Sequence, residues 1–124
     1  MTKQFAQHIG HVLDEAEKAI IAGVVECEDE YRALTANDEA ELGDRASRSK
    51  SLDELGSVIA YYERRLSRTR AAKRRLRNGT YGLCLECGKK IKQNRLKARP
   101  DALFCISCAQ RRERLKRYRV VPSY

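Results

Sequence analysis

Residues 52–76 read LDELGSVIAYYERRLSRTRAAKRRL, and this stretch decides the fold. Alternating steps of three and four residues from Leu52 meet an apolar side chain at six of eight positions. The positions are Leu52, Leu55, Ile59, Tyr62, Leu66, Thr69, Lys73 and Leu76, with Thr69 and Lys73 as the exceptions. This spacing is typical of a helix that packs along a second helix. The stretch therefore predicts one arm of a coiled coil.

The partner helix is expected upstream, from Phe5 to Leu34, where no proline occurs. Apolar residues recur there at helical spacing: Phe5, Ile9, Val12, Ala16, Ala19, Ile20, Val24, Cys27, Tyr31 and Leu34. Residues 35–51 lose this pattern and contain turn-forming Asn37 and Gly43. Because this connection is short, the two helices are expected to form an antiparallel hairpin, an arm about 40 Å long.

The ends of the second helix have local signals. Ser51 and Glu54 form a capping box, and Asp44 or Ser47 would cap an earlier start. Asn78-Gly79 predicts the C-terminal end. The predicted fold class is mainly α, with a hairpin over residues 1–79 whose tip lies near 36–50. Residues 80–124 are predicted to hold a cysteine module and a basic helix from Ile106 to about Tyr118.

Four cysteines follow a metal-binding pattern: Cys84-x-x-Cys87, seventeen residues, then Cys105-x-x-Cys108. Two redox dithiols or four ordinary buried cysteines are the alternatives, but the paired spacing favours a tetrahedral zinc site. Four thiolates leave no open position on the ion, which indicates one structural Zn²⁺ per chain and no enzymatic role. Gly88 would permit the positive φ that such a turn needs.

The fifth cysteine and the two histidines lie apart from this pattern. Cys27 is in step with Val24 and Tyr31, which predicts a buried position inside the hairpin. His8 and His11 are expected on the surface rather than as metal ligands.

The charge distribution points to the partner. The formal net charge is +9, but residues 1–47 carry −7 and residues 48–124 carry +16. A basic chain of this size suggests nucleic acid, or a machine that handles it, as the partner. No apolar run reaches the length of a membrane span and the N-terminus does not resemble a secretory signal. The metal-type cysteine pairs suit a reducing cytoplasm.

The predicted hairpin tip is acidic, with Asp38, Glu39, Glu41 and Asp44 close together. One interpretation is an ordinary solvated turn. The other is that a thin arm carries carboxylates into a narrow, positively lined or Mg²⁺-containing cavity. The residues alone leave both interpretations open.

The stretch YGLCLECGKKIKQNRLKARPDALFCISCAQ, residues 81–110, closely resembles the zinc finger of the DksA/TraR C4-type family. The matching features are Tyr81-Gly82, Ile91, Arg95-Leu96, Ala98-Arg99-Pro100 and both cysteine pairs. Gly43-Asp44-Arg45-Ala46 is similar to the family's tip motif, and the likeness extends from about Asp38 onward.

This resemblance implies a monomeric bacterial transcription regulator that binds RNA polymerase rather than a specific DNA sequence. In the family the coiled coil enters the secondary channel and modulates open promoter complexes, often with the alarmone ppGpp of the stringent response. The family's critical tip pair corresponds to Asp44 and Ala46, and two of its ppGpp contacts correspond to Arg68 and Arg99. Ala109 replaces a family lysine, and the chain starts close to the hairpin; both departures argue against ppGpp dependence and indicate a paralogue.

A second hypothesis is a zinc-ribbon protein that binds nucleic acid directly through the basic segment around Arg111 to Arg119. The acidic tip argues against it, because DNA phosphates would repel carboxylates. No nucleophile–base pair or glycine-rich phosphate loop supports an enzyme.

Overall fold

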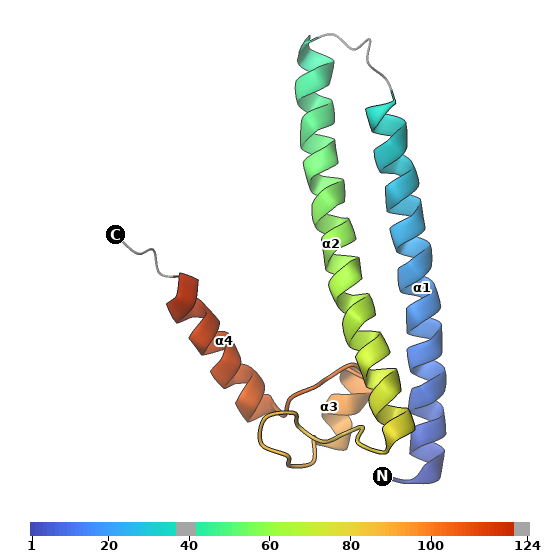
Figure 1. The fold of residues 1–124 in the computed structure, drawn as a ribbon, viewed down its shortest axis with the longest axis vertical. Helices are drawn as coiled ribbons and strands as arrows, with labels where there is room; N and C mark the ends of the chain where they lie inside the picture. Colours follow the sequence, from blue (N-terminus) through green and yellow to red (C-terminus); the bar gives the residue numbers. More distant parts are fainter. Residues whose placement is uncertain (37–41, 121–124) are drawn as a thin grey trace. The chain divides into compact units, whose positions relative to one another are not determined.

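The computed structural model describes residues 1–36 and 42–120 (Figure 1). These residues form four helices and no strand: α1 (Lys3–Thr35), α2 (Leu42–Asn78), α3 (Gln93–Ala98) and α4 (Ile106–Val120). The mainly α fold class is confirmed, with the long helix pair and the cysteine module both present. No helix within the described ranges is long and apolar enough to cross a membrane.

The chain divides into two compact units, which we name the hairpin unit and the zinc unit. The hairpin unit is Asp14–Ser67 and the zinc unit is Met1–Leu13 with Arg68–Tyr124. Both long helices contribute to both units. The sequence predicts a domain boundary between residues 79 and 80, and that boundary stays a prediction.

The hairpin unit contains two helices that run antiparallel and side by side (Figure 1). Gly23 of α1 lies against the ring of Tyr62 of α2, while Tyr31 lies near Gly56, earlier in α2. A Cβ on Gly23 would stand 3.1 Å from Cζ of Tyr62, so the missing side chain provides the space for the ring. Two helices cover each other along one seam only, and Ile20 is the sole buried residue among those described in this unit.

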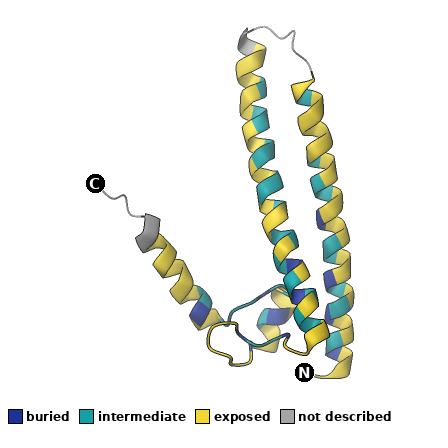
Figure 2. Cartoon of the chain, viewed as in Figure 1, coloured by how far each residue is buried: buried dark blue, intermediate teal, exposed yellow. Residues whose placement is uncertain are grey.

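The zinc unit holds most of the core (Figure 2). Ile9 and Leu13 of α1 are each 1% exposed, and Gly10 brings α1 close to Leu76 of α2. Their cluster includes residues of the cysteine module: Tyr81, Cys84, Ile91, Leu96, Ala102 and Cys108. A metal-stapled module thus supplies the third layer that two helices alone lack.

The structure corrects the predicted apolar stripes in the zinc unit. On α1, Leu13 is fully buried while Val12 is only half-buried. On α2, Thr69 of the heptad is 2% exposed, but Ala72, outside the heptad, is 1% exposed, whereas Lys73 of the heptad is half-buried. The buried stripe widens beyond the predicted positions because these segments pack against the cysteine module as well as against each other.

Two helix ends have clear causes. Thr2 caps α1, because its Oγ1 accepts a hydrogen bond of 3.1 Å from the backbone N–H of Phe5. As predicted, α2 ends at Asn78-Gly79: Gly79 has φ of 76°, and the N–H of Thr80 donates to the carbonyl of Arg75 at 2.9 Å. At its other end α2 begins at Leu42, before the capping positions Asp44, Ser47 and Ser51 expected from the sequence.

Candidate metal centre

The first cysteine pair lies in a tight loop after α2. The N–H of Cys84 donates to the carbonyl of Lys89 at 2.8 Å, and the N–H of Gly88 donates to the carbonyl of Cys84 at 3.0 Å. Gly88 has φ of 73°, as predicted, a conformation that residues with a Cβ rarely adopt. Leu83 and Lys90 close the loop through an isolated antiparallel bridge. This geometry turns the loop back so that both sulfurs face one point.

The second pair lies at the N-terminal end of α4. Cys105 directly precedes the helix and Cys108 lies in its first turn, where the N–H of Ala109 donates to the carbonyl of Cys105 at 2.9 Å. The N-terminal end of a helix carries partial positive charge and unpaired N–H groups, which favour thiolates. The helix start therefore both positions and stabilises the second sulfur pair.

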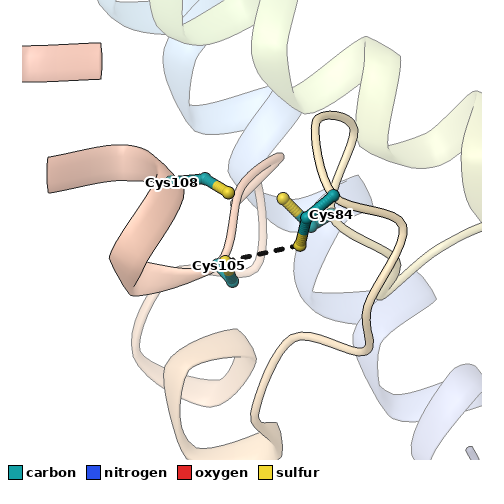
Figure 3. A group of neighbouring side chains, drawn as sticks. Cys84, Cys105 and Cys108 are labelled. Atoms are coloured by element: carbon teal, nitrogen blue, oxygen red, sulfur yellow. Dashed lines mark hydrogen bonds between the residues drawn. The ribbon is translucent and has the colours of Figure 1, made fainter. Parts of the chain in front are cut away.

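The four sulfurs lie within 4.8 Å of one another, and those of Cys87 and Cys105 are 3.8 Å apart. Figure 3 shows Cys84, Cys105 and Cys108 converging from the loop and from α4. Zn–S bonds of about 2.3 Å in a tetrahedron place sulfurs about 3.8 Å apart. The four cysteines Cys84, Cys87, Cys105 and Cys108 therefore fit a structural Zn²⁺.

The pKa values of the thiols reflect this crowding. Burial opposes ionisation of Cys84, but hydrogen bonds from the backbone of Cys87, Cys105 and Glu86 outweigh it and lower its pKa to about 6. A hydrogen bond from the backbone of Cys108 is the main cause of the lowered pKa of Cys105. The hydrogen bond to Cys105 and then burial raise the pKa of Cys108 to about 12. Sulfurs this close cannot all ionise without a cation among them, and a dication supplies that charge.

Hydrogen bonds around the centre hold the module to α2. The hydroxyl of Tyr81 donates to the carbonyl of Pro100 at 2.8 Å, and the side chain of Arg75 donates to the carbonyls of Thr80 and Leu83. Burial, and secondarily the charge of Asp101, raises the pKa of Tyr81 to about 12.

The two predicted ppGpp contacts, Arg68 and Arg99, line one cavity of about 330 Å³ in the zinc unit. Ala109 lines it too. Three further cations line the same cavity: Arg95, which the sequence interpretation did not single out, and Arg112 and Lys116 of the basic segment from Arg111 to Arg119. They come from α3 and α4, so only the fold brings them to Arg68.

Three of these arginines are held by neighbours. Nε of Arg95 donates to the carbonyl of Phe104 at 3.0 Å. Nε of Arg68 lies 3.5 Å from Oδ2 of Asp101 and makes no hydrogen bond within the described structure. The guanidinium of Arg112 lies over the ring of Phe104, 4.3 Å from its centre. The cavity thus presents five cations together with the carboxylates of Asp101 and Glu113.

The predicted tip pair, Asp44 and Ala46, belongs to the hairpin unit, whereas the cavity and the cysteines belong to the zinc unit. Both residues are exposed, as expected for Asp44, but they lie in the first turns of α2 rather than in a loop. The other acidic positions of the predicted tip, Asp38, Glu39 and Glu41, lie outside the described residues.

Cys27 is half-buried, so the prediction of a buried thiol is corrected. A single facing helix covers only part of its side chain. His8 and His11 are exposed, as predicted, and neither belongs to the metal-ligand cluster.

Comparison with known proteins shows which proteins these features resemble. Residues 79–114 match the prokaryotic dksA/traR C4-type zinc finger. The RNA polymerase-binding transcription factor DksA of Caulobacter vibrioides is 39% identical over 63% of this chain, and the match spans 55% of that protein. An uncharacterised protein of Aquifex aeolicus is 28% identical over 92% of this chain and 80% of its own length.

The fold agrees with these matches. The solved structure of transcription factor DksA2 from Pseudomonas aeruginosa superposes with a TM-score of 0.81 at 26% identity, covering 94% of this chain and 89% of that one. The fold and the sulfur cluster define a helical-hairpin protein with a structural zinc finger. Residues 79–114 thus match the DksA/TraR C4-type zinc finger, and the chain is similar in sequence and fold to the DksA proteins named above.

Proposed function

We propose that this protein is a bacterial transcription regulator that binds RNA polymerase. Its hairpin unit enters the secondary channel and changes the stability of open promoter complexes. It acts in the cytoplasm as a monomer and is not an enzyme. The observation that carries the proposal is a two-helix arm with exposed Asp44 and Ala46, in a chain that shares the family's zinc finger.

The charge division supports this proposal. The hairpin unit contains fourteen acidic and seven basic residues, a net −7, and the zinc unit contains three acidic and nineteen basic residues, a net +16. A thin acidic arm suits a narrow cavity that carries positive charge or Mg²⁺, where a globular domain would not fit. The basic unit suits an acidic protein surface at the entrance of such a cavity.

Replacement of Asp44 with Asn tests the role of the arm. The change keeps the size of the side chain and removes its charge from an exposed position. We expect the variant to retain zinc, helicity and core-polymerase affinity within about threefold, since exposed substitutions cost little. Its effect on transcription from a stable-RNA promoter should be lost.

Asp53→Asn is the matched control, because Asp53 is also an exposed carboxylate on α2 in the hairpin unit. It should regulate as the unmodified protein does. Normal regulation by the Asp44 variant would show that the first turns of α2 are only a solvated surface. Loss of helicity would instead make Asp44 a structural residue.

We further propose that ppGpp binds between polymerase and the cavity lined by Arg68 and Arg99. The support is the cluster of five cations on that cavity, which offers bidentate guanidinium contacts to phosphate and compensates for Ala109. Double replacement of Arg68 and Arg99 with Ala should abolish the effect of ppGpp on transcription. An equal ppGpp effect with both proteins, or none with the unmodified protein, would refute this part.

A second candidate function is direct binding of nucleic acid by α4. Its favouring observation is a row of exposed cations, Arg111, Arg112, Arg114, Lys116 and Arg117. Filter binding of duplex DNA over a salt series distinguishes the two candidate functions. Tight binding whose affinity falls steeply with salt concentration favours direct binding of nucleic acid. Weak binding together with capture by core polymerase favours the regulator.

A further inference from the structure

We infer that a notch around Gly56 on the hairpin unit receives a lysine or arginine side chain of RNA polymerase. This inference rests on the proposed function and names a contact that the arm would make. It depends on three features of the notch: its walls, the absence of a side chain at residue 56, and one unpaired carboxylate.

The notch lies between α1 and α2 and has a volume of about 430 Å³. Five residues line it: Glu28, Tyr31, Arg32, Gly56 and Ile59. Tyr31 is 39% exposed, so much of its ring faces solvent. The walls are therefore apolar, with charged groups on the α1 side.

Gly56 opens the notch at a cost to the helix. It lies inside α2, where glycine is less favourable than every residue except proline. Its φ lies outside the left-handed range, and a Cβ built on it would meet no atom within 4 Å beyond its chain neighbours and its own helix backbone. Gly23, by contrast, makes room for Tyr62 of the same chain. Neither backbone conformation nor packing within the described chain requires glycine at 56, so we assign the requirement to a partner.

The charges indicate which side chain enters. The side chain of Arg32 is occupied by an ion pair with Asp29, whereas Glu28 has no ion pair or hydrogen bond within the described residues. Lysine and arginine combine an apolar stem with a cationic head. The stem would lie against Tyr31 and Ile59 while the head reaches Glu28. The net charge of −7 on the hairpin unit also favours a basic partner surface over an acidic one.

Replacement of Gly56 with Leu should fill the notch without disturbing the helix, since the space at its Cβ is empty. We expect affinity for core polymerase to fall about tenfold, the usual loss when one well-buried contact is blocked. Gly56→Ala should raise the Tm and yet weaken binding. Ser57→Ala is the matched control: it also improves helix propensity at an exposed neighbour outside the notch, and it should leave affinity unchanged.

Replacement of Glu28 with Gln tests the charge. The variant should bind polymerase more weakly, and its affinity should depend less on salt, because one ion pair is gone. Glu30→Gln removes an equally exposed carboxylate of α1 outside the notch. Apart from the effect of losing one negative charge, it should change neither the affinity for polymerase nor the salt dependence of that affinity.

The outcomes separate this inference from the proposed function. If the unmodified protein does not bind core polymerase, the proposed function fails. If it binds and both Gly56→Leu and Glu28→Gln bind equally tightly, the notch is empty in the complex and the inference fails. If Gly56→Leu weakens binding while Glu28→Gln does not, a basic occupant is refuted.

Discussion

At the scale of single residues, Tyr81 shows how burial and one hydrogen bond tie the zinc finger together. Its hydroxyl donates to Pro100, and its pKa is raised to about 12. Tyr81→Phe should lower the free energy of unfolding by about 1 kcal/mol at neutral pH, the value of one hydrogen bond. Because the folded pKa exceeds the ordinary value of 10, this advantage is complete below pH 10 and is lost as the pH rises towards 12. Denaturant unfolding of both proteins across this range should show the difference closing; a constant difference would contradict it. Tyr61→Phe, at an exposed tyrosine of the hairpin unit, is the control and should cost little.

At the scale of elements, α2 has two glycines, one inside it and one at its end, where substitution should have opposite effects. Gly79 ends α2 with φ of 76°, and a Cβ there would meet nothing within 4 Å. Gly79→Ala should therefore destabilise the protein by about 1 kcal/mol through backbone strain alone. Gly56 has the same free space without the positive φ, so alanine there should stabilise. Thermal unfolding of the two variants measures whether each substitution raises or lowers the Tm. Equal shifts in one direction would show that the end of α2 relaxes without the left-handed residue.

At the scale of the whole molecule, metal binding should decide whether the zinc unit folds. The core cluster includes Cys84 and Cys108 among its buried residues, so loss of the metal removes part of the core packing. We expect one zinc per chain by metal analysis, and we expect Cys105→Ser to lose zinc and most of the cooperative melting of this unit. Structural zinc contributes on the order of 10 kcal/mol to such modules. Cys27→Ser is the matched control, since Cys27 lies in the other unit, and it should keep one zinc. An unchanged melting curve for Cys105→Ser would exclude a structural metal.

The sequence alone was sufficient for the helices and for the ligand set. The heptad from Leu52 to Leu76, the paired cysteines and the Asn78-Gly79 ending are local patterns, and a helix period or a C-x-x-C turn depends on residues close in the chain. The structure agrees with these local predictions because no contact between distant segments was needed to produce them.

Other features depended on which segments pack together. Leu13 lies in the core where Val12 was expected, and Ala72, outside the predicted heptad, is buried too, because the cysteine module covers those faces of the helices. Arg95 and Arg112 join Arg68 on one cavity only because the fold brings residues of α3 and α4 to the same cavity as α2. The notch at Gly56 exists because α1 and α2 pair in one particular register. Long-range packing sets each of these, and no periodicity within one segment encodes where another segment will lie against it.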